Sequence, residues 1–245
     1  MSDENHAPTG EPPVAPYAAE RWLIGVVVLA AVVFAAQAGA LLTYVLSMRD
    51  APRTAVERRL AADEAAVQDR PQDIENWARV ALSYASAERW SDAADAISRG
   101  RAIKSAAILD LTEADILRMK GDAAAIQAYD RAITSASAEY EQQKKALLKD
   151  KNVRVPPPSR LLAEALAGRA LALHAAGRTR EAVDQAMKAL EADPSDAELH
   201  AALGDMLVSV GRKADAETQY REALRYVPDL KQALDGLRTL GAGVK

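Results

Sequence analysis

The sequence contains no cysteine and only three histidines, His6, His174 and His200. The absence of cysteine excludes disulfide bonds, thiolate chemistry and the softest metal ligand. His174 and His200 stand 26 positions apart, and no carboxylate accompanies them at a metal-ligand spacing. A glycine-rich phosphate loop is also missing, because the glycines mark turns and close packing instead. We therefore expect no enzyme activity, no catalytic residue, no metal site, no cofactor and no small-molecule substrate.

Aromatic residues make up 4% of the 245 residues, whereas hydrophobic residues make up 49%, with alanine dominating. This composition favours close-packed helices and disfavours a β-sandwich, so we predict an all-α fold. The formal net charge is −4. A chain of this charge has no general attraction to nucleic acid, and we expect no nucleic-acid partner.

A repeat of 34 residues runs through the second half of the chain. The matching pairs are Gly177 and Gly211, Ala182 and Ala216, Ala189 and Ala223, and Pro194 and Pro228. Self-similarity at this period indicates a solenoid built from helix pairs. In the last unit, Gly204 and Ala216 are small enough for two antiparallel helices to approach closely. Gly211 fits the turn between these helices, and Pro228 ends the second one.

The last unit resembles a tetratricopeptide repeat (TPR). The residues that carry the resemblance are Leu203, Gly204, Leu207, Gly211, Ala216, Tyr220, Ala223 and Pro228. His200 departs from the pattern, because the family usually has a bulky aromatic residue there. The resemblance implies a scaffold of helical hairpins, and it leaves open what the scaffold binds.

Near the N-terminus, Arg21 and Arg49 bracket 27 residues that carry no charge. About 20 apolar residues suffice to cross the hydrocarbon core of a bilayer, so this stretch is long enough. Trp22 and Tyr44 stand near its ends, where aromatic side chains favour the membrane interface. The apolar run is too long for a signal peptide, and an acidic tail precedes it where a basic region belongs. We predict a single transmembrane helix over 22–48 that contacts the lipid bilayer.

The charges that flank this helix bear on its orientation. One basic residue, Arg21, precedes the helix, whereas Arg49, Arg53, Arg58 and Arg59 follow it. Basic residues favour the cytoplasmic side, which slightly favours a cytoplasmic repeat domain. Many anchored bacterial TPR proteins that this chain resembles carry their repeats outside the inner membrane. We expect a single-pass protein of the bacterial inner membrane, with the periplasmic placement kept as the alternative.

The chain divides into the following segments. Residues 1–21 are an acidic, Pro-rich tail expected to be disordered, 22–48 the transmembrane helix, and 49–73 a linking helix or half repeat. Residues 74–133 are TPR repeats 1 and 2, the second degenerate, 161–228 are repeats 3 and 4, and 229–245 are a capping helix and tail. Between them, 134–160 is an insertion with an extended helix and a Pro-rich loop. It is either an ordinary connection or a docking surface peculiar to this protein.

The resemblance also implies a binding site, because partner peptides of TPR proteins lie in a groove lined by the first helices of the repeats. Family positions give Glu75, Ala78, Leu82 and Ala85 in repeat 1, Glu164, Ala167, Leu171 and His174 in repeat 3, and Glu198, Ala201, Asp205 and Val208 in repeat 4. The Lys and Asn residues with which some family members bind a C-terminal carboxylate are missing at these positions. The groove has small and apolar residues with acidic rims, which favours an apolar or basic protein or peptide partner. Its carboxylates are equally consistent with an ordinary solvated surface.

The sequence therefore predicts a membrane-tethered TPR scaffold or adaptor that serves the assembly or quality control of a membrane-associated complex. One alternative is a permanent structural subunit of a membrane complex. Another is the anchored TPR component of bacterial cytochrome c maturation, which presents apoprotein and requires an extracytoplasmic repeat domain.

Overall fold

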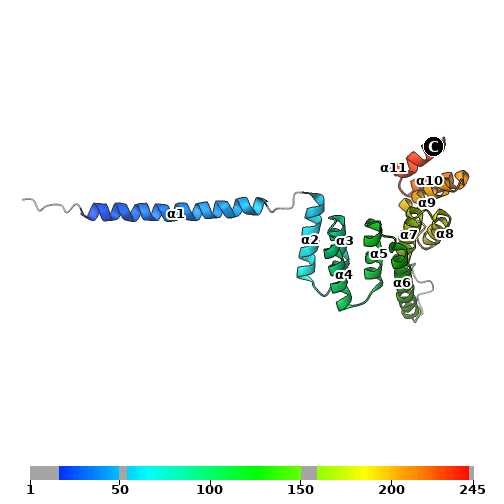
Figure 1. The fold of residues 1–245 in the computed structure, drawn as a ribbon, viewed down its shortest axis with the longest axis horizontal. Helices are drawn as coiled ribbons and strands as arrows, with labels where there is room; N and C mark the ends of the chain where they lie inside the picture. The colour runs from blue at the N-terminus through cyan, green and yellow to red at the C-terminus, as the bar shows by residue number, and fades with distance from the viewer. Residues whose placement is uncertain (1–16, 50–53, 150–158, 243–245) are drawn as a thin grey trace, which may run out of the picture. The chain divides into compact units, whose positions relative to one another are not determined.

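The computed structural model describes residues 17–49, 54–149 and 159–242. Within these ranges the regular structure consists of eleven α-helices and no strand (Figure 1). The predicted all-α fold is therefore confirmed. The chain forms two compact units, 1–53 and 54–245, which we describe separately. Most of the predicted N-terminal tail and the Pro-rich loop of the insertion lie outside the described residues.

The first unit contains helix α1 (Tyr17–Arg49). Its segment Trp22–Thr43, 22 residues long, is long and apolar enough to cross a membrane, and its side chains are exposed. The helix begins before the apolar run, within the predicted tail 1–21. Alanine and glutamate stand just before the apolar run, and both are good helix formers, so the helix continues beyond the residues that hydrophobicity alone selects.

The second unit is a stack of helical hairpins. Its helices are α2 (Ala55–Asp69), α3 (Ile74–Ser86), α4 (Trp90–Ile103), α5 (Ala107–Met119), α6 (Ala125–Leu147), α7 (Arg160–Ala175), α8 (Thr179–Ala192), α9 (Ala197–Ser209), α10 (Lys213–Tyr226) and α11 (Lys231–Thr239). Helices α3, α5, α7 and α9 are the first helices of four hairpins, and α4, α6, α8 and α10 are the second helices. Helix α2 packs on α3 before the first hairpin, and α11 packs on α9 and α10 after the last.

Short polar side chains begin three of the first helices. Asp73, Ser159 and Asp196 each accept a hydrogen bond from a backbone N–H in the first turn of α3, α7 and α9, respectively. Such caps satisfy N–H groups that have no partner inside the helix. Helix α5 is the exception, because Ala106 precedes it and cannot cap it.

The same turn joins the two helices of every hairpin. In each, a backbone N–H donates to a carbonyl five residues earlier at 2.8 to 2.9 Å, as from Arg212 to Leu207. This Schellman turn needs one residue in the left-handed conformation, which glycine adopts without steric cost. Gly121, Gly177 and Gly211 fill that place with φ between 74° and 80°, but in the first hairpin it is filled by Glu88 with φ 58°.

The stack curves around its first helices. Among the described elements, first helices contact one another in succession from α3 to α9 and on to α11, whereas no second helix contacts the next second helix. Helices that touch lie closer together than helices that do not. The first-helix side is therefore the compressed, concave side of the solenoid, as in other curved repeat stacks.

Two tyrosines of the second helices are wedged between backbones. The buried ring of Tyr220 on α10 lies against Gly204 of α9 and Gly236 of α11, where any added Cβ atom would overlap it. The buried ring of Tyr129 on α6 occupies the same kind of space against Gly168 of α7. These glycines allow a large ring to fill the seam between hairpins, which only a residue without a side chain permits.

Helix α2 is held to α3 by a buried carboxylate. Asp63 accepts hydrogen bonds from Nε of Arg79 at 2.7 Å and from Oγ of Ser83 at 2.5 Å. Leu60 and Val67 of α2 are buried beside it in the core of the first hairpin. A buried charge is tolerated when it is fully hydrogen-bonded, so this contact fixes the register of α2 on the solenoid.

Replacement of Gly204 by alanine tests the wedge. We expect the Gly204→Ala variant to lose roughly 1–3 kcal/mol of unfolding free energy, because the new methyl group overlaps the Tyr220 ring. The measurement is urea unfolding followed by circular dichroism. A smaller ring-free residue relieves the overlap, so the double variant Gly204→Ala/Tyr220→Leu should lose less than the sum of the two single losses. Strict additivity would contradict the proposed contact.

Replacement of Glu88 by glycine tests the strained turn. A left-handed conformation costs an ordinary residue about 1–2 kcal/mol, part of which glycine recovers. We expect Glu88→Gly to raise the unfolding free energy by roughly 0.5–1 kcal/mol, again measured by urea unfolding. Glu88→Ala is the control, because alanine keeps the strain and should give no gain. Equal stability of the two variants would show that the turn is not strained.

Candidate functional site

The predicted binding residues lie on the first helices, on the concave side of the solenoid. Glu75, Glu164 and Glu198 are exposed near the starts of α3, α7 and α9. Leu82, Ala167, Leu171, His174, Asp205 and Val208 are half-buried. Ala78, Ala85 and Ala201 are buried, each at most 4% exposed, so their side chains belong to the core. Nine of the twelve residues therefore have surface to offer a partner, and three serve the packing beneath them.

In the fourth hairpin, a tyrosine from the second helix reaches a carboxylate on the concave side. The hydroxyl of Tyr220 donates to Oδ1 of Asp205 at 2.5 Å. The other oxygen of Asp205 accepts from Nε2 of Gln232 on α11 at 2.7 Å. Burial and the neighbouring Asp205 carboxylate raise the pKa of Tyr220, so the hydroxyl keeps its proton and remains a donor.

The second hairpin repeats this arrangement. The hydroxyl of Tyr129 donates to Oδ1 of Asp115 at 2.5 Å and accepts from Nε of Arg118 at 2.9 Å. Burial raises the pKa of Tyr129, and the carboxylate of Asp115 raises it further. Burial also raises the pKa of Asp115, against the opposing effects of the Tyr129 hydrogen bond and of Arg118. Two half-buried carboxylates of first helices, Asp115 and Asp205, are thus held by tyrosines of the second helices.

The sequence prediction missed the contribution of the second hairpin to the concave face. Asp115 and Arg118 are half-buried on its first helix α5, and Ile108, also half-buried, lies near the start of that helix. The hairpin is one residue shorter at its turn, since Asp115 and Tyr129 are 14 positions apart while Asp205 and Tyr220 are 15 apart. Correcting the register by this one residue would have aligned the two tyrosine–aspartate pairs.

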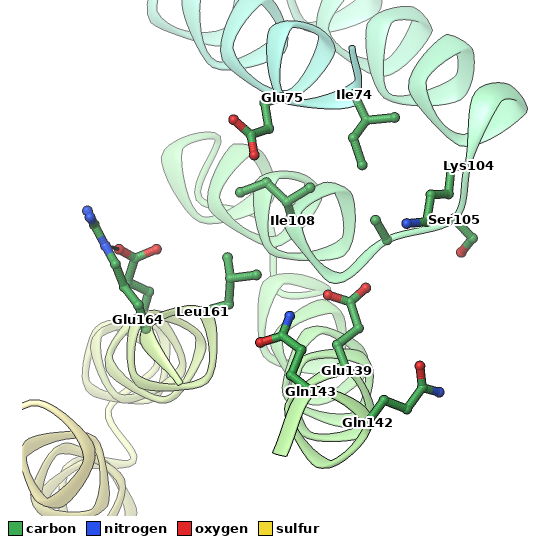
Figure 2. A pocket seen from close by; sticks show the side chains of 12 residues that line it. Ile74, Glu75, Lys104, Ser105, Ile108, Glu139, Gln142, Gln143, Leu161 and Glu164 are labelled. Carbon is green, nitrogen blue, oxygen red and sulfur yellow. Dashed lines mark hydrogen bonds and ion pairs between the residues drawn. The ribbon is translucent and has the colours of Figure 1, made fainter. Parts of the chain in front are cut away.

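A cleft of about 810 Å³ opens at the starts of the first helices. Figure 2 shows Ile74, Ile108 and Leu161 converging on it from α3, α5 and α7, while Glu139 and Gln143 point toward them from α6. Glu75 and Glu164, both predicted as groove residues, also line this cleft. The structure therefore brings two predicted residues together with residues of the insertion that the sequence did not assign to the groove.

The two histidines of the solenoid both have polar neighbours within 3.2 Å. Among residues 17–49, 54–149 and 159–242, no three histidines, cysteines or carboxylates are arranged to hold a metal ion. His200 is buried, with its ring nitrogens 2.8 Å from Gln219 Oε1 and 3.1 Å from the carbonyl of Pro194. His174 lies near the end of α7, and its Nδ1 is 3.2 Å from Oγ1 of Thr179 at the start of α8. Both histidines are therefore held by neighbouring side chains or backbone.

The solved structures that resemble this chain include yeast Tom70, PilW and TTC0263. Yeast Tom70 superposes with a TM-score of 0.58 at 17% identity, covering 82% of this chain and 37% of that one. PilW, described as a widely conserved type IV pilus biogenesis factor, superposes with a TM-score of 0.54 at 17% identity. The match covers 82% of this chain and 84% of PilW. TTC0263, a thermophilic TPR protein of Thermus thermophilus, superposes with a TM-score of 0.53 at 19% identity. The match covers 74% of this chain and 88% of TTC0263. At these identities the likeness shows the fold alone, which is a TPR-type helical solenoid.

No curated protein matches the chain by sequence. A family model described as the bacterial transcriptional activator domain (BTAD) matches residues 109–236, from helix α5 into helix α11. The match contains the two tyrosine–aspartate pairs and all four hairpin helices from α7 to α10. Because it spans more than half of the 245 residues, the chain belongs to the bacterial transcriptional activator domain family.

Proposed function

We propose that this protein is a membrane-tethered TPR scaffold whose concave face binds a segment of a protein partner. The role is the assembly or quality control of a membrane-associated complex. The single observation that carries the proposal is the continuous concave layer of first helices, which offers half-buried apolar side chains, such as Leu82 and Leu171, among exposed carboxylates. A face of this kind supplies apolar contact area with charges that select the partner.

The charges of the face favour a basic or apolar partner. The carboxylates of Glu75 and Glu198 are exposed, and no residue in the described part of the chain pairs with either of them. Glu164 is already bound by Nε of Arg160 at 2.7 Å. Unpaired carboxylates attract a lysine or arginine of a partner and repel an acidic segment.

Helix α1 supports the tether. The apolar side chains of Trp22–Thr43 are exposed, and a soluble protein rarely exposes so large a continuous apolar surface. Lipid would cover them, and 22 residues are enough to cross the membrane. The arginines that follow the helix favour the cytoplasm for the solenoid. In this proposal the protein crosses the bacterial inner membrane once.

A second candidate function rests on the family match. In that reading the solenoid is the protein-binding part of a bacterial regulator of transcription, as the name of the family suggests. The formal net charge of −4 disfavours direct attraction to DNA, so the contact would again be with protein. The two candidates share the binding face and differ in the identity of the partner.

A fluorescent protein fused after Lys245 tests the tether and its orientation. We expect fluorescence at the cell boundary, because the apolar helix holds the chain in the membrane and a cytoplasmic fusion folds. Arginine at the centre of a membrane helix costs about 2.5–3.5 kcal/mol. The double variant Leu29→Arg/Val32→Arg should therefore give diffuse fluorescence.

The matched control for the tether is Leu29→Val/Val32→Leu, which keeps the helix apolar and should remain at the boundary. Diffuse fluorescence of the unaltered chain would contradict the tether. If the fluorescent fusion were intact but dark, and a phosphatase fused at the same position were active, the solenoid would lie on the opposite side of the membrane.

A photoreactive amino acid at Leu171 tests the concave face as the partner site. We expect one major crosslinked protein from Leu171, and the same protein from Leu82, because both side chains lie on the concave side. Met187 is the control, since it is 48% exposed on the second helix α8. Mass spectrometry of the product separates a membrane-complex component from a transcription protein. Crosslinks from Met187 with none from either leucine would contradict the proposed face.

A further inference from the structure

Helix α6 is longer than the other second helices. It has 23 residues, whereas α4, α8 and α10 have 14 each. The nine additional residues, Glu139–Leu147, lie within the predicted insertion 134–160; we call them the α6 extension. The helix is unbroken from Ala125, so the extension is a rigid projection.

A specific contact holds the α6 extension beside α5. Oε1 of Glu139 accepts a hydrogen bond from the backbone N–H of Ala107 at 2.7 Å. This carboxylate therefore caps α5, which has no cap from its own preceding residue Ala106. A carboxylate at the start of a helix also interacts favourably with the helix dipole. The arrangement stabilises α5 and places the extension next to the first helices.

The α6 extension forms one wall of the cleft in Figure 2. The residues that α6 contributes to the lining are Glu139, Gln142 and Gln143, and all three belong to the extension. A second helix of 14 residues would end before them, and the cleft would have no wall on this side. A smaller hollow of about 280 Å³ between the extension and the start of α7 shares Glu139 and Gln143 with the cleft.

The lining has polar groups that the described part of the protein leaves unused. Within it, no residue bonds to the side-chain amides of Gln142 and Gln143 or to the carboxylate of Glu75, and all three side chains are exposed. Glu139 and Glu164 are already engaged, with Ala107 and Arg160. The available groups are therefore the carboxylate of Glu75, the two amides, the exposed ammonium of Lys104 and the hydroxyl of Ser105, around an apolar floor. The three carboxylates of the lining, on Glu75, Glu139 and Glu164, still outnumber its two cations, on Lys104 and Arg160.

We infer that the cleft binds an extended peptide segment in which a basic side chain stands between apolar ones, with the α6 extension as the wall that holds its backbone. The inference rests on the proposed function and names its site and ligand class. Glu75 meets the basic side chain, and the apolar side chains meet Ile74, Ile108 and Leu161. Each glutamine amide has a donor and an acceptor, as a peptide group does. An extended segment has backbone groups free to pair with them, whereas a helix bonds its own.

The test is binding of short fluorescein-labelled peptides to the full chain in nanodiscs of zwitterionic lipid, measured by anisotropy with empty nanodiscs subtracted. One peptide has a lysine between two valines, flanked by serines; the other has glutamate in place of lysine. We expect the lysine peptide to bind more tightly. Glu75→Gln should weaken its binding roughly two- to fivefold, which is the range for an exposed ion pair. Gln143→Lys should weaken it about tenfold or more, because it adds a like charge to the wall.

The controls use the same residue types elsewhere. Gln127→Lys adds the same charge to an exposed position of α6 outside the cleft, and Glu191→Gln removes an exposed carboxylate of α8. Both should leave binding unchanged. Equal effects of Gln143→Lys and Gln127→Lys, equal binding of the two peptides, or no binding would each overturn the inference. The proposed function would still stand if crosslinks from Leu82 and Leu171 gave a partner, so the two failures are distinguishable.

Discussion

The packing of two tyrosine rings against glycines of neighbouring helices sets the geometry of the solenoid. Tyr220 lies between Gly204 and Gly236, and Tyr129 lies against Gly168. Each ring fills the seam where one hairpin meets the next, and the missing side chains let the next first helix pack closely. Close packing of first helices, without contact between second helices, produces the curvature. The concave face therefore depends on a steric match of large rings with residues that lack a side chain.

The same tyrosines give the concave face its chemistry. Each hydroxyl donates to an aspartate on the first helix of its own hairpin, Tyr129 to Asp115 on α5 and Tyr220 to Asp205 on α9. Packing and recognition are thereby coupled, because a change in the ring alters both the helix spacing and the orientation of a carboxylate. Glu139 also has two effects, because its one hydrogen bond caps α5 and holds the α6 extension, which lines the cleft.

The family match separates the shared part of the chain from the parts that lie outside it. It begins at residue 109 and covers the hairpins from α5 onward, whereas α1, α2 and the first hairpin precede it. The first hairpin also differs locally, with Glu88 in place of glycine at its turn and a buried carboxylate, Asp63, that joins it to α2. Under the proposed function, this segment follows the membrane helix in the chain and contributes Glu75 and Leu82 of α3 to the binding face.

The sequence by itself determined the helical class, the hairpin repeat and the apolar N-terminal helix, because periodicity, turn glycines and an uncharged run are local signals. It also assigned the twelve candidate binding residues to the first helices of three hairpins, α3, α7 and α9. Only the tertiary structure decided which of those residues are covered, since Ala78, Ala85 and Ala201 are buried by neighbouring helices that no local pattern locates. It alone showed the tyrosine–aspartate pair of the second hairpin, whose register is shifted by one residue, and the position of the α6 extension. That position depends on a hydrogen bond between residues 32 positions apart, and contacts at such separation are set by packing.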